Sequence, residues 1–383
     1  MMRWKVWVVS VILGWVACLL FISCLPALWA QTPAHRLNEA EAAIARGQPE
    51  KALAAIDQFM DELKQGKVMG PRRAQQLDHA GKILTGLKER DSQSSRAGYL
   101  LGEIRFLQNQ FEEALEILSP LRPENMKNAD YFNLVGMCRG GLNQLSAAAQ
   151  DVITAIGLAP QRADLYFNLA GLYQKAGDNR GAIEVLNRAI SKGMVTPEIH
   201  FALGLSYYNL GNFSSANESF ARAVKMRPEF GKAYLYRGRC SNRLRNTTEA
   251  VASYRKSIAL NPNDFLAYLE LGELLLDLQA STEGIQLMEK AVRLNPNSSE
   301  SHYQLGKAYS KLGKADAAVT ELERAIGLNP DQDGAYQELA RLFLKEGKKE
   351  QAEALLTALN DRKQKRKAQY ERKVSGDSLQ KDP

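Results

Sequence analysis

The sequence predicts an all-α solenoid, in which two-helix units stack one after another along the chain. Eight stretches align without insertion or deletion at a spacing of 34 residues, starting at residues 95, 129, 163, 197, 231, 265, 299 and 333. A constant period of this length is typical of helical repeat proteins. Because such an array grows by stacking, the 383 residues predict one elongated domain rather than several globular ones.

Two columns of small residues predict where the two helices of each unit meet. Position 8 is Gly or Ala in all eight repeats, from Gly102 to Ala340, and so is position 20, from Ala114 to Ala352. Two helices approach closely only where both carry small side chains. Positions 4, 7, 8 and 11 share one helix face, which predicts the packing stripe of the first helix.

Turn residues mark the ends of the predicted helices. A Gly recurs at position 15, although Arg245 and Gln279 replace it in the fifth and sixth repeats. Pro recurs at position 32, where it ends the second helix because it cannot continue a helical backbone. Met126 and Met194 replace this Pro in the first and third repeats, so we expect looser junctions there.

These residue types at fixed offsets resemble the tetratricopeptide repeat family over residues 95–360. Position 4, often Trp in that family, is Tyr, Phe or His in the second to eighth repeats. The resemblance implies an α-solenoid of helix-turn-helix repeats that forms a right-handed superhelix. It also implies a non-enzymatic scaffold or adaptor whose concave groove holds a protein or peptide segment, with bacterial envelope assembly or secretion as the expected setting.

We divide the chain into four segments. Residues 1–30 form a signal peptide or N-terminal membrane anchor, and residues 31–94 form a degenerate repeat followed by an extra helix that opens at Pro71. Residues 361–383 form a basic, partly disordered tail, with disorder expected from Ser375 to Pro383. The eight repeats between them occupy residues 95–128, 129–162, 163–196, 197–230, 231–264, 265–298, 299–332 and 333–360.

The N-terminal segment predicts export. Arg3 and Lys5 precede an apolar run over residues 6–25, and the sequence Ala27-Leu28-Trp29-Ala30 then precedes a polar stretch. This pattern is typical of a signal peptide cleaved after Ala30 and predicts a periplasmic or extracellular protein. The run is also about long enough to span a bilayer. Retention as an anchor over residues 6–25, with the repeats outside the cytoplasm, is therefore the alternative.

Charge and cysteine content limit the other partners. The net charge is +7, and residues 360–383 carry eight Lys or Arg against four Asp or Glu, so the basic character is concentrated in the tail. This tail offers a second kind of contact, with an anionic membrane surface or polymer, whereas specific nucleic-acid binding is not expected. Cys138 and Cys240 lie three repeats apart, too far for a disulfide.

The groove itself is expected at positions 2, 5, 9, 12 and 13 of the first helices, as the resemblance implies. Phe167, Phe201, Leu205 and Tyr208 occupy these positions in the third and fourth repeats and predict an apolar anchor for a partner. The alternative is that neighbouring repeats bury some of these side chains.

The fifth repeat adds basic residues to the same stripe. Lys232, Arg239 and Arg243 are candidates for binding carboxylates of a partner. The alternative is that they pair with Glu270, Glu273 and Asp277 of the next repeat.

No catalytic, cofactor or metal site is predicted. His200 and His302 both stand at position 4, a packing position, and are expected in the core. Motifs such as CxxC, HExxH, GxSxG and GxxxxGK[ST] do not occur in the sequence. The Lys and Asn carboxylate clamp of chaperone-binding relatives is also absent, since only Asn168 fits it.

Overall fold

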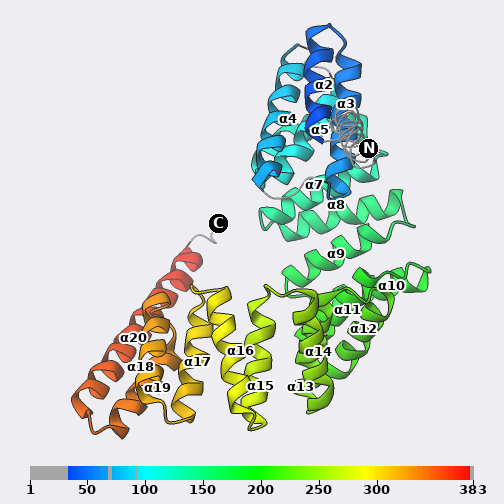
Figure 1. The fold of residues 1–383 in the computed structure, drawn as a ribbon. Coiled ribbons are helices and arrows are strands. Elements are labelled where there is room, and N and C mark those ends of the chain that lie inside the picture. Colours follow the sequence, from blue (N-terminus) through cyan, green and yellow to red (C-terminus); the bar gives the residue numbers. More distant parts are fainter. Residues whose placement is uncertain (1–32, 68–70, 91–93, 380–383) are drawn as a thin grey trace, which may run out of the picture. The chain divides into compact units, whose positions relative to one another are not determined.

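The computed structural model describes residues 33–67, 71–90 and 94–379, and every regular element within these ranges is helical. The predicted all-α fold of stacked helix pairs is therefore confirmed. The chain divides into two compact units, residues 1–194 and 195–383 (Figure 1). The boundary follows Met194, one of the two junctions where Met replaces the Pro of position 32.

The first unit begins with a helix pair and a single helix, followed by three helix pairs. Short 3₁₀ turns, η1 (Ser119–Leu121) and η2 (Pro123–Asn125), follow the short second helix of the first repeat. The helices are α2 (Pro33–Ala45), α3 (Pro49–Lys64), α4 (Pro71–Arg90), α5 (Ser95–Leu107), α6 (Phe111–Leu118), α7 (Ala129–Gly141), α8 (Leu145–Leu158), α9 (Ala163–Lys175) and α10 (Asn179–Ser191).

The second unit consists of five helix pairs. Its helices are α11 (Pro197–Asn209), α12 (Phe213–Met226), α13 (Gly231–Arg243), α14 (Thr247–Leu260), α15 (Phe265–Asp277), α16 (Ser281–Leu294), α17 (Ser299–Lys311), α18 (Ala315–Leu328), α19 (Asp333–Lys345) and α20 (Lys349–Leu379). In both units, the first helix of every repeat begins at the first residue of its 34-residue stretch.

The small residues at position 8 make room for the second helix of the same repeat. A Cβ atom added at Gly204 would lie 2.6 Å from the ring of Phe220, and one at Gly238 would lie 2.8 Å from the ring of Tyr254. Both aromatic residues stand at position 24 and are fully buried. A larger residue at position 8 would therefore displace a large core side chain.

The turn between the two helices of a repeat requires a left-handed backbone at position 15. Glycine supplies it in four repeats, but Arg245 and Gln279 adopt φ values of 59° and 63°, and Asn109 and Asn143 adopt 60° and 62°. This conformation is unfavourable for residues that carry a Cβ atom. The geometry of the repeat thus overrides the local preference of the residue.

The last helix is longer than the sequence analysis predicted. α20 continues to Leu379, so the disorder expected from Ser375 is wrong for residues 375–379, while residues 380–383 lie outside the described ranges. Position 32 of this repeat is Gln364, which does not stop a helix as Pro does. Arg366 further holds α20 against the start of α19 through Asp333, at 2.6 Å.

The predicted signal peptide or anchor, residues 1–30, lies outside the described residues. Among the helices that are described, none is long and apolar enough to cross a membrane.

Candidate functional site

A groove runs along the first helices of three successive repeats in the first unit, which we call the unit 1 groove. It consists of two adjoining depressions of about 530 Å³ and about 610 Å³, which share Phe106, Leu107 and Met137. The helices α5, α7 and α9 supply most of its lining from repeat positions 2, 5, 9, 12 and 13. These are the positions at which the resemblance placed a groove.

The first depression has an apolar floor and a charged rim. Its floor includes Met60, Leu100 and Leu134, while α3 and α5 contribute most of the charges. Lys64 reaches across from α3 to Glu103 at 2.8 Å, and Arg96 pairs with Asp57. Each of these cations is thus neutralised within the protein.

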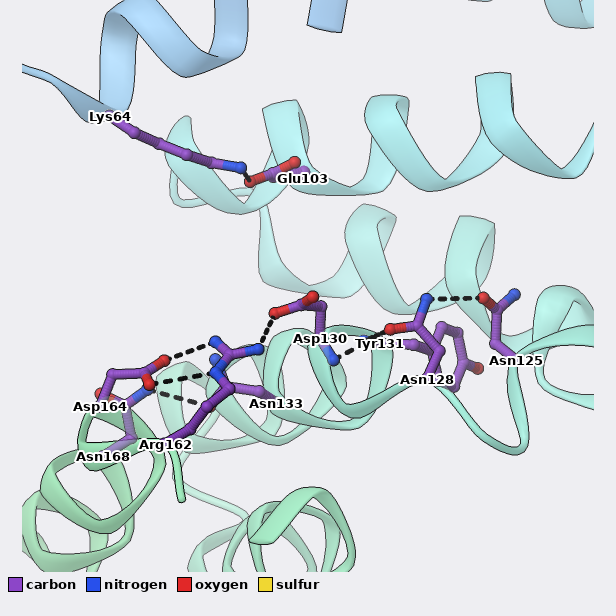
Figure 2. A network of polar contacts seen from close by, with 10 residues as sticks. All are labelled: Lys64, Glu103, Asn125, Asn128, Asp130, Tyr131, Asn133, Arg162, Asp164 and Asn168. Carbon is purple, nitrogen blue, oxygen red and sulfur yellow. Dashed lines mark hydrogen bonds and ion pairs between the residues drawn. The ribbon is translucent and has the colours of Figure 1, made fainter. Parts of the chain in front are cut away.

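A polar network continues this rim over α7 and α9 (Figure 2). Arg162, the last residue of the second repeat, binds Asp130 at the start of the same repeat and also donates to Asp164 of the next repeat at 2.6 Å. The side-chain amide of Asn168 donates a hydrogen bond to Asn133 at 2.9 Å, which links α9 directly to α7. These contacts between repeats hold the helices that form the groove at a defined spacing.

One hydroxyl group in the first depression keeps its proton. Burial raises the pKa of Tyr99, and the nearby carboxylates of Glu103 and Asp130 raise it further. The phenol therefore stays neutral at physiological pH and remains a hydrogen-bond donor and acceptor beside the groove.

The second depression is more apolar and exposes helix backbone. Phe106 and Phe111 lie with ring centroids 5.8 Å apart on one wall, and Phe167 is 37% exposed. Gly141 and Gly171 complete the lining. The ring of Phe111 covers the helix at Gly141, whereas no atom lies within 4 Å of a Cβ atom added at Gly171, so the helix is uncovered there. Phe167 is thus the one residue of the predicted aromatic anchor that lines the unit 1 groove.

The remaining residues of the predicted anchor belong to a cluster in the second unit. Phe201 packs against Phe220, Phe230 and Tyr236 with centroid distances of 4.9 to 5.8 Å, and it is only 8% exposed. The prediction that Phe201 is an exposed anchor is therefore wrong. Phe220 and Phe230 of the same repeat and Tyr236 of the following repeat cover this side chain, so a neighbouring repeat accounts for only part of its burial.

Leu205 and Tyr208 are half-buried at the edge of the same cluster. Tyr208 makes edge contacts with the rings of Phe213 and Tyr236, at 5.4 Å and 5.8 Å. These two residues contribute to core packing, and only part of each side chain faces solvent.

The predicted basic residues of the fifth repeat have different environments. Arg239 binds Glu270 through two nitrogens at 2.5 to 2.9 Å and lies over the ring of Tyr236, so its predicted pairing alternative is the observed one. A guanidinium held in this way is not available to a partner carboxylate. Arg243 is exposed and lies over Phe213 at 5.8 Å, and Lys232 is exposed.

A carboxyl group with an unusual pKa lies nearby in the second unit. Burial and the charges of Glu270 and Glu300 raise the pKa of Glu273 to about 7, although Lys307 opposes the shift. Glu273 lines a small depression of about 140 Å³ with Lys307 and Lys311. The carboxyl group therefore loses its proton near neutral pH, because burial and the neighbouring carboxylates disfavour its charged form.

Two histidine and two cysteine residues of the described ranges are buried. His200 and His302 are buried, and His302 is held by Glu321 at 2.6 Å and by the carbonyl of Pro296 at 3.1 Å. Cys138 and Cys240 are buried free thiols, and burial raises the pKa of each to about 12. No group of residues suited to hold a metal ion occurs within the described part of the chain.

The sequence analysis missed most of the unit 1 groove. It did not consider Tyr99, Phe106 and Met137, although they occupy positions 5, 12 and 9 of the first two repeats. The repeat register alone was sufficient to find them. What it did not reveal was that the fourth repeat closes its own stripe with aromatic packing while the first three leave theirs open.

A stack of helix pairs with a groove along its first helices defines a helical repeat scaffold suited to protein–protein interaction. Models described as tetratricopeptide repeat match residues 33–58, 72–138, 163–191, 201–265, 243–299, 287–320 and 311–374. The chain belongs to the tetratricopeptide repeat family.

One related protein matches part of the chain. Tetratricopeptide repeat protein 36 of Danio rerio is 39% identical over 83 residues, which are 22% of this chain and 44% of that protein. The chain thus spans less than half the length of this relative.

Two solved structures show the same fold. One is the Cut9–Hcn1 hetero-tetramer of the APC/C, with a TM-score of 0.52 and 16% identity over 77% of this chain and 59% of that chain. The other is PilF of Pseudomonas aeruginosa, with a TM-score of 0.50 and 18% identity over 56% of this chain and 97% of that chain.

Proposed function

We propose that this protein is a non-enzymatic adaptor that holds a segment of a partner protein in the unit 1 groove. The observation that carries the proposal is the continuity of the two depressions across three repeats, with exposed apolar side chains and helix backbone in the second. Covering such a surface releases water, and burying one Leu or Phe of a partner contributes about 1.5–3 kcal/mol.

The groove is also organised before a partner arrives. As described above, Arg162 binds Asp130 of α7, and Asn168 of α9 donates to Asn133 of α7. A site whose walls are already fixed loses little conformational entropy on binding, so more of the contact energy appears as affinity.

A glycine provides the sharpest test of this proposal. Gly171 lines the second depression, and a Cβ atom added there would meet no other atom within 4 Å. A Gly171→Leu variant should therefore fold, because it also improves helix propensity, while its side chain fills the groove. Gly157→Leu is the matched control: it lies on α8, equally open, and outside both depressions.

Affinity capture from the native source with these two variants decides the matter. We expect one or a few proteins to be retained by the wild type and by Gly157→Leu but lost with Gly171→Leu. Partners that bind all three proteins equally would place the binding surface elsewhere and contradict the proposal.

We also propose that the protein is exported and acts in bacterial envelope assembly or secretion. The support is the basic start, the apolar run over residues 6–25 and Ala30 directly before the polar Gln31. Cleavage after Ala30 would release a periplasmic or extracellular protein, whereas retention would leave it membrane-anchored. Fractionation combined with the mass of the mature N-terminus distinguishes the two forms, and a cytoplasmic protein that keeps Met1 would contradict both.

The alternative function is binding to an anionic polymer or membrane surface through the basic C-terminal region. It is favoured by Lys365 and Lys367, which are exposed on α20, although Arg366 is engaged by Asp333. In this case binding should weaken steeply with salt and be lost in a Lys365→Glu, Lys367→Glu variant, while Gly171→Leu has no effect.

A further inference from the structure

The unit 1 groove has a composition that selects among partner segments. Resting on the function proposed above, we propose that its second depression recognises a peptide segment with a bulky apolar side chain next to a carboxylate. The argument has three parts: the apolar wall, the recess at a glycine, and the charges that border them.

The wall accepts a large apolar side chain. Phe106, Phe111 and Phe167 contribute aromatic surface from three different helices, and Met137 lies between them at the junction with the first depression. Met is unbranched and adapts its shape to different apolar partners. Such a surface binds Leu, Ile, Met or Phe of a partner more favourably than a polar side chain.

The recess results from the residue at position 9 of the third repeat. Gly171 leaves open space at a position that carries a side chain in each of the other seven repeats. Those side chains belong to Glu103, Met137, Leu205, Arg239, Glu273, Lys307 and Arg341. Among the eight residues at position 9, Gly171 alone lets a partner side chain approach the helix backbone closely, since glycine has no side chain.

The border of the second depression is cationic. Arg73 from α4 and Lys175 from α9 line it, and no Asp or Glu does. Lys175 donates to the carbonyl of Gly140 at 2.6 Å, which holds its ammonium group at the end of α7. An ammonium group has three N–H donors, and Lys175 forms no ion pair within the described part of the chain. Arg73 is exposed and forms no ion pair with another described residue.

The first depression differs in this respect. Its lining contains Lys64, Arg96 and Arg162, but each pairs with a carboxylate of the protein. Asp78 lines a neighbouring depression together with Arg73 and accepts a hydrogen bond from Gln108 at 3.1 Å. Uncompensated positive charge is therefore confined to the apolar end, where a carboxylate beside an apolar side chain finds its complement.

The test uses a random-peptide display library selected on the full chain. We expect the wild type to enrich peptides that have Asp or Glu within a few residues of Leu, Ile, Met or Phe. Arg73→Glu combined with Lys175→Gln should lose this acidic preference. The matched control is Arg180→Glu combined with Lys192→Gln, which makes the same charge change at exposed residues of the third repeat outside the groove.

Fluorescence anisotropy with one enriched peptide then gives the magnitude. We expect the groove charge variant to weaken binding about tenfold and the control variant to leave it unchanged. A peptide with its acids replaced by Lys should bind Arg73→Glu better than it binds the wild type. Circular dichroism of each variant verifies that the fold is intact.

The outcomes separate this inference from the function on which it rests. Enrichment that disappears in Gly171→Leu but shows no acidic preference would leave the groove as a binding site and overturn the proposed chemistry. Enrichment of phosphorylated peptides over carboxylate peptides in a parallel selection would overturn it too. No enrichment that depends on Gly171 would overturn both.

Discussion

At the scale of single residues, the environment of Glu273 makes the stability of the second unit depend on pH. Its pKa of about 7 lies above the ordinary value of a glutamic acid, so the folded state binds the proton more tightly than the unfolded state. The stability that protonation contributes is fully present below the unfolded pKa and is lost as pH rises through about 7. The charges of Glu270, Glu300 and Asp277 then disfavour ionised Glu273, and Lys307 opposes them.

We therefore expect Glu273→Gln to stabilise the protein at alkaline pH. The free energy of unfolding should rise by about 1–3 kcal/mol near pH 8 and change little near pH 5, because Gln removes the charge in both states. Urea unfolding at the two pH values measures this difference. Glu323→Gln, an exposed carboxylate on α18, is the control and should show no such dependence; an equal gain at both pH values would show that packing rather than ionisation is responsible.

Arg245 is a second residue whose cost can be measured. Its φ of 59° is natural for glycine but strained for arginine, and its side chain is exposed. We expect Arg245→Gly to raise the unfolding free energy by about 0.5–1 kcal/mol. Lys256→Gly, in the interior of α14, should lower it by a similar amount because glycine weakens a helix there. A loss of stability in both variants would mean that Arg245 makes contacts worth more than its backbone strain.

At the scale of elements, the positions of the helices were the most predictable feature. The solvent exposure of the side chains on them was the least predictable. The period, the small residues and the turn residues define where each helix begins, because these features act within one repeat. Whether a groove position is open depends on which side chains of its own repeat and of the following repeat pack over it. Phe201 is covered by Phe230 and Tyr236, whereas Phe167 is not covered, and both stand at position 5. Local patterns do not contain that information.

The length of α20 is also an element-scale property with a single determinant. Gln364 replaces the Pro that ends the second helix in five of the other repeats. We expect Gln364→Pro to end the helix before this residue, since Pro costs about 3 kcal/mol in a helix interior. Hydrogen exchange should then become fast for the amides beyond residue 364, and the contact of Arg366 with Asp333 should be lost. Gln364→Ala should leave exchange unchanged, and protection that survives the Pro variant would mean that tertiary contacts alone order this segment.

At the scale of the whole molecule, each unit has its own apolar core. Clusters around Phe59, Ile104 and Phe132 belong to residues 1–194, and those around Phe220 and Leu322 belong to residues 195–383. A solenoid is stabilised mainly by contacts within repeats and between neighbouring repeats. Separating the chain at the boundary between the two units therefore leaves most contacts of each unit in place. The Met at position 32 of the third repeat marks this division in the sequence.

We therefore expect residues 195–383 to fold without the first unit. The fragment contains five complete helix pairs, more than the three that a stable stack requires. Its circular dichroism should be strongly helical, and its urea unfolding should be cooperative, with the pH dependence of Glu273 intact. A second fragment that begins at residue 231 would lack α11 and α12 and with them the rings that pack on Tyr236, such as Phe201 and Phe220; we expect it to unfold at lower urea. If both fragments unfold at the same urea concentration, the aromatic cluster contributes little to the stability of the second unit. Its aromatic side chains would then serve contact with a partner rather than the fold.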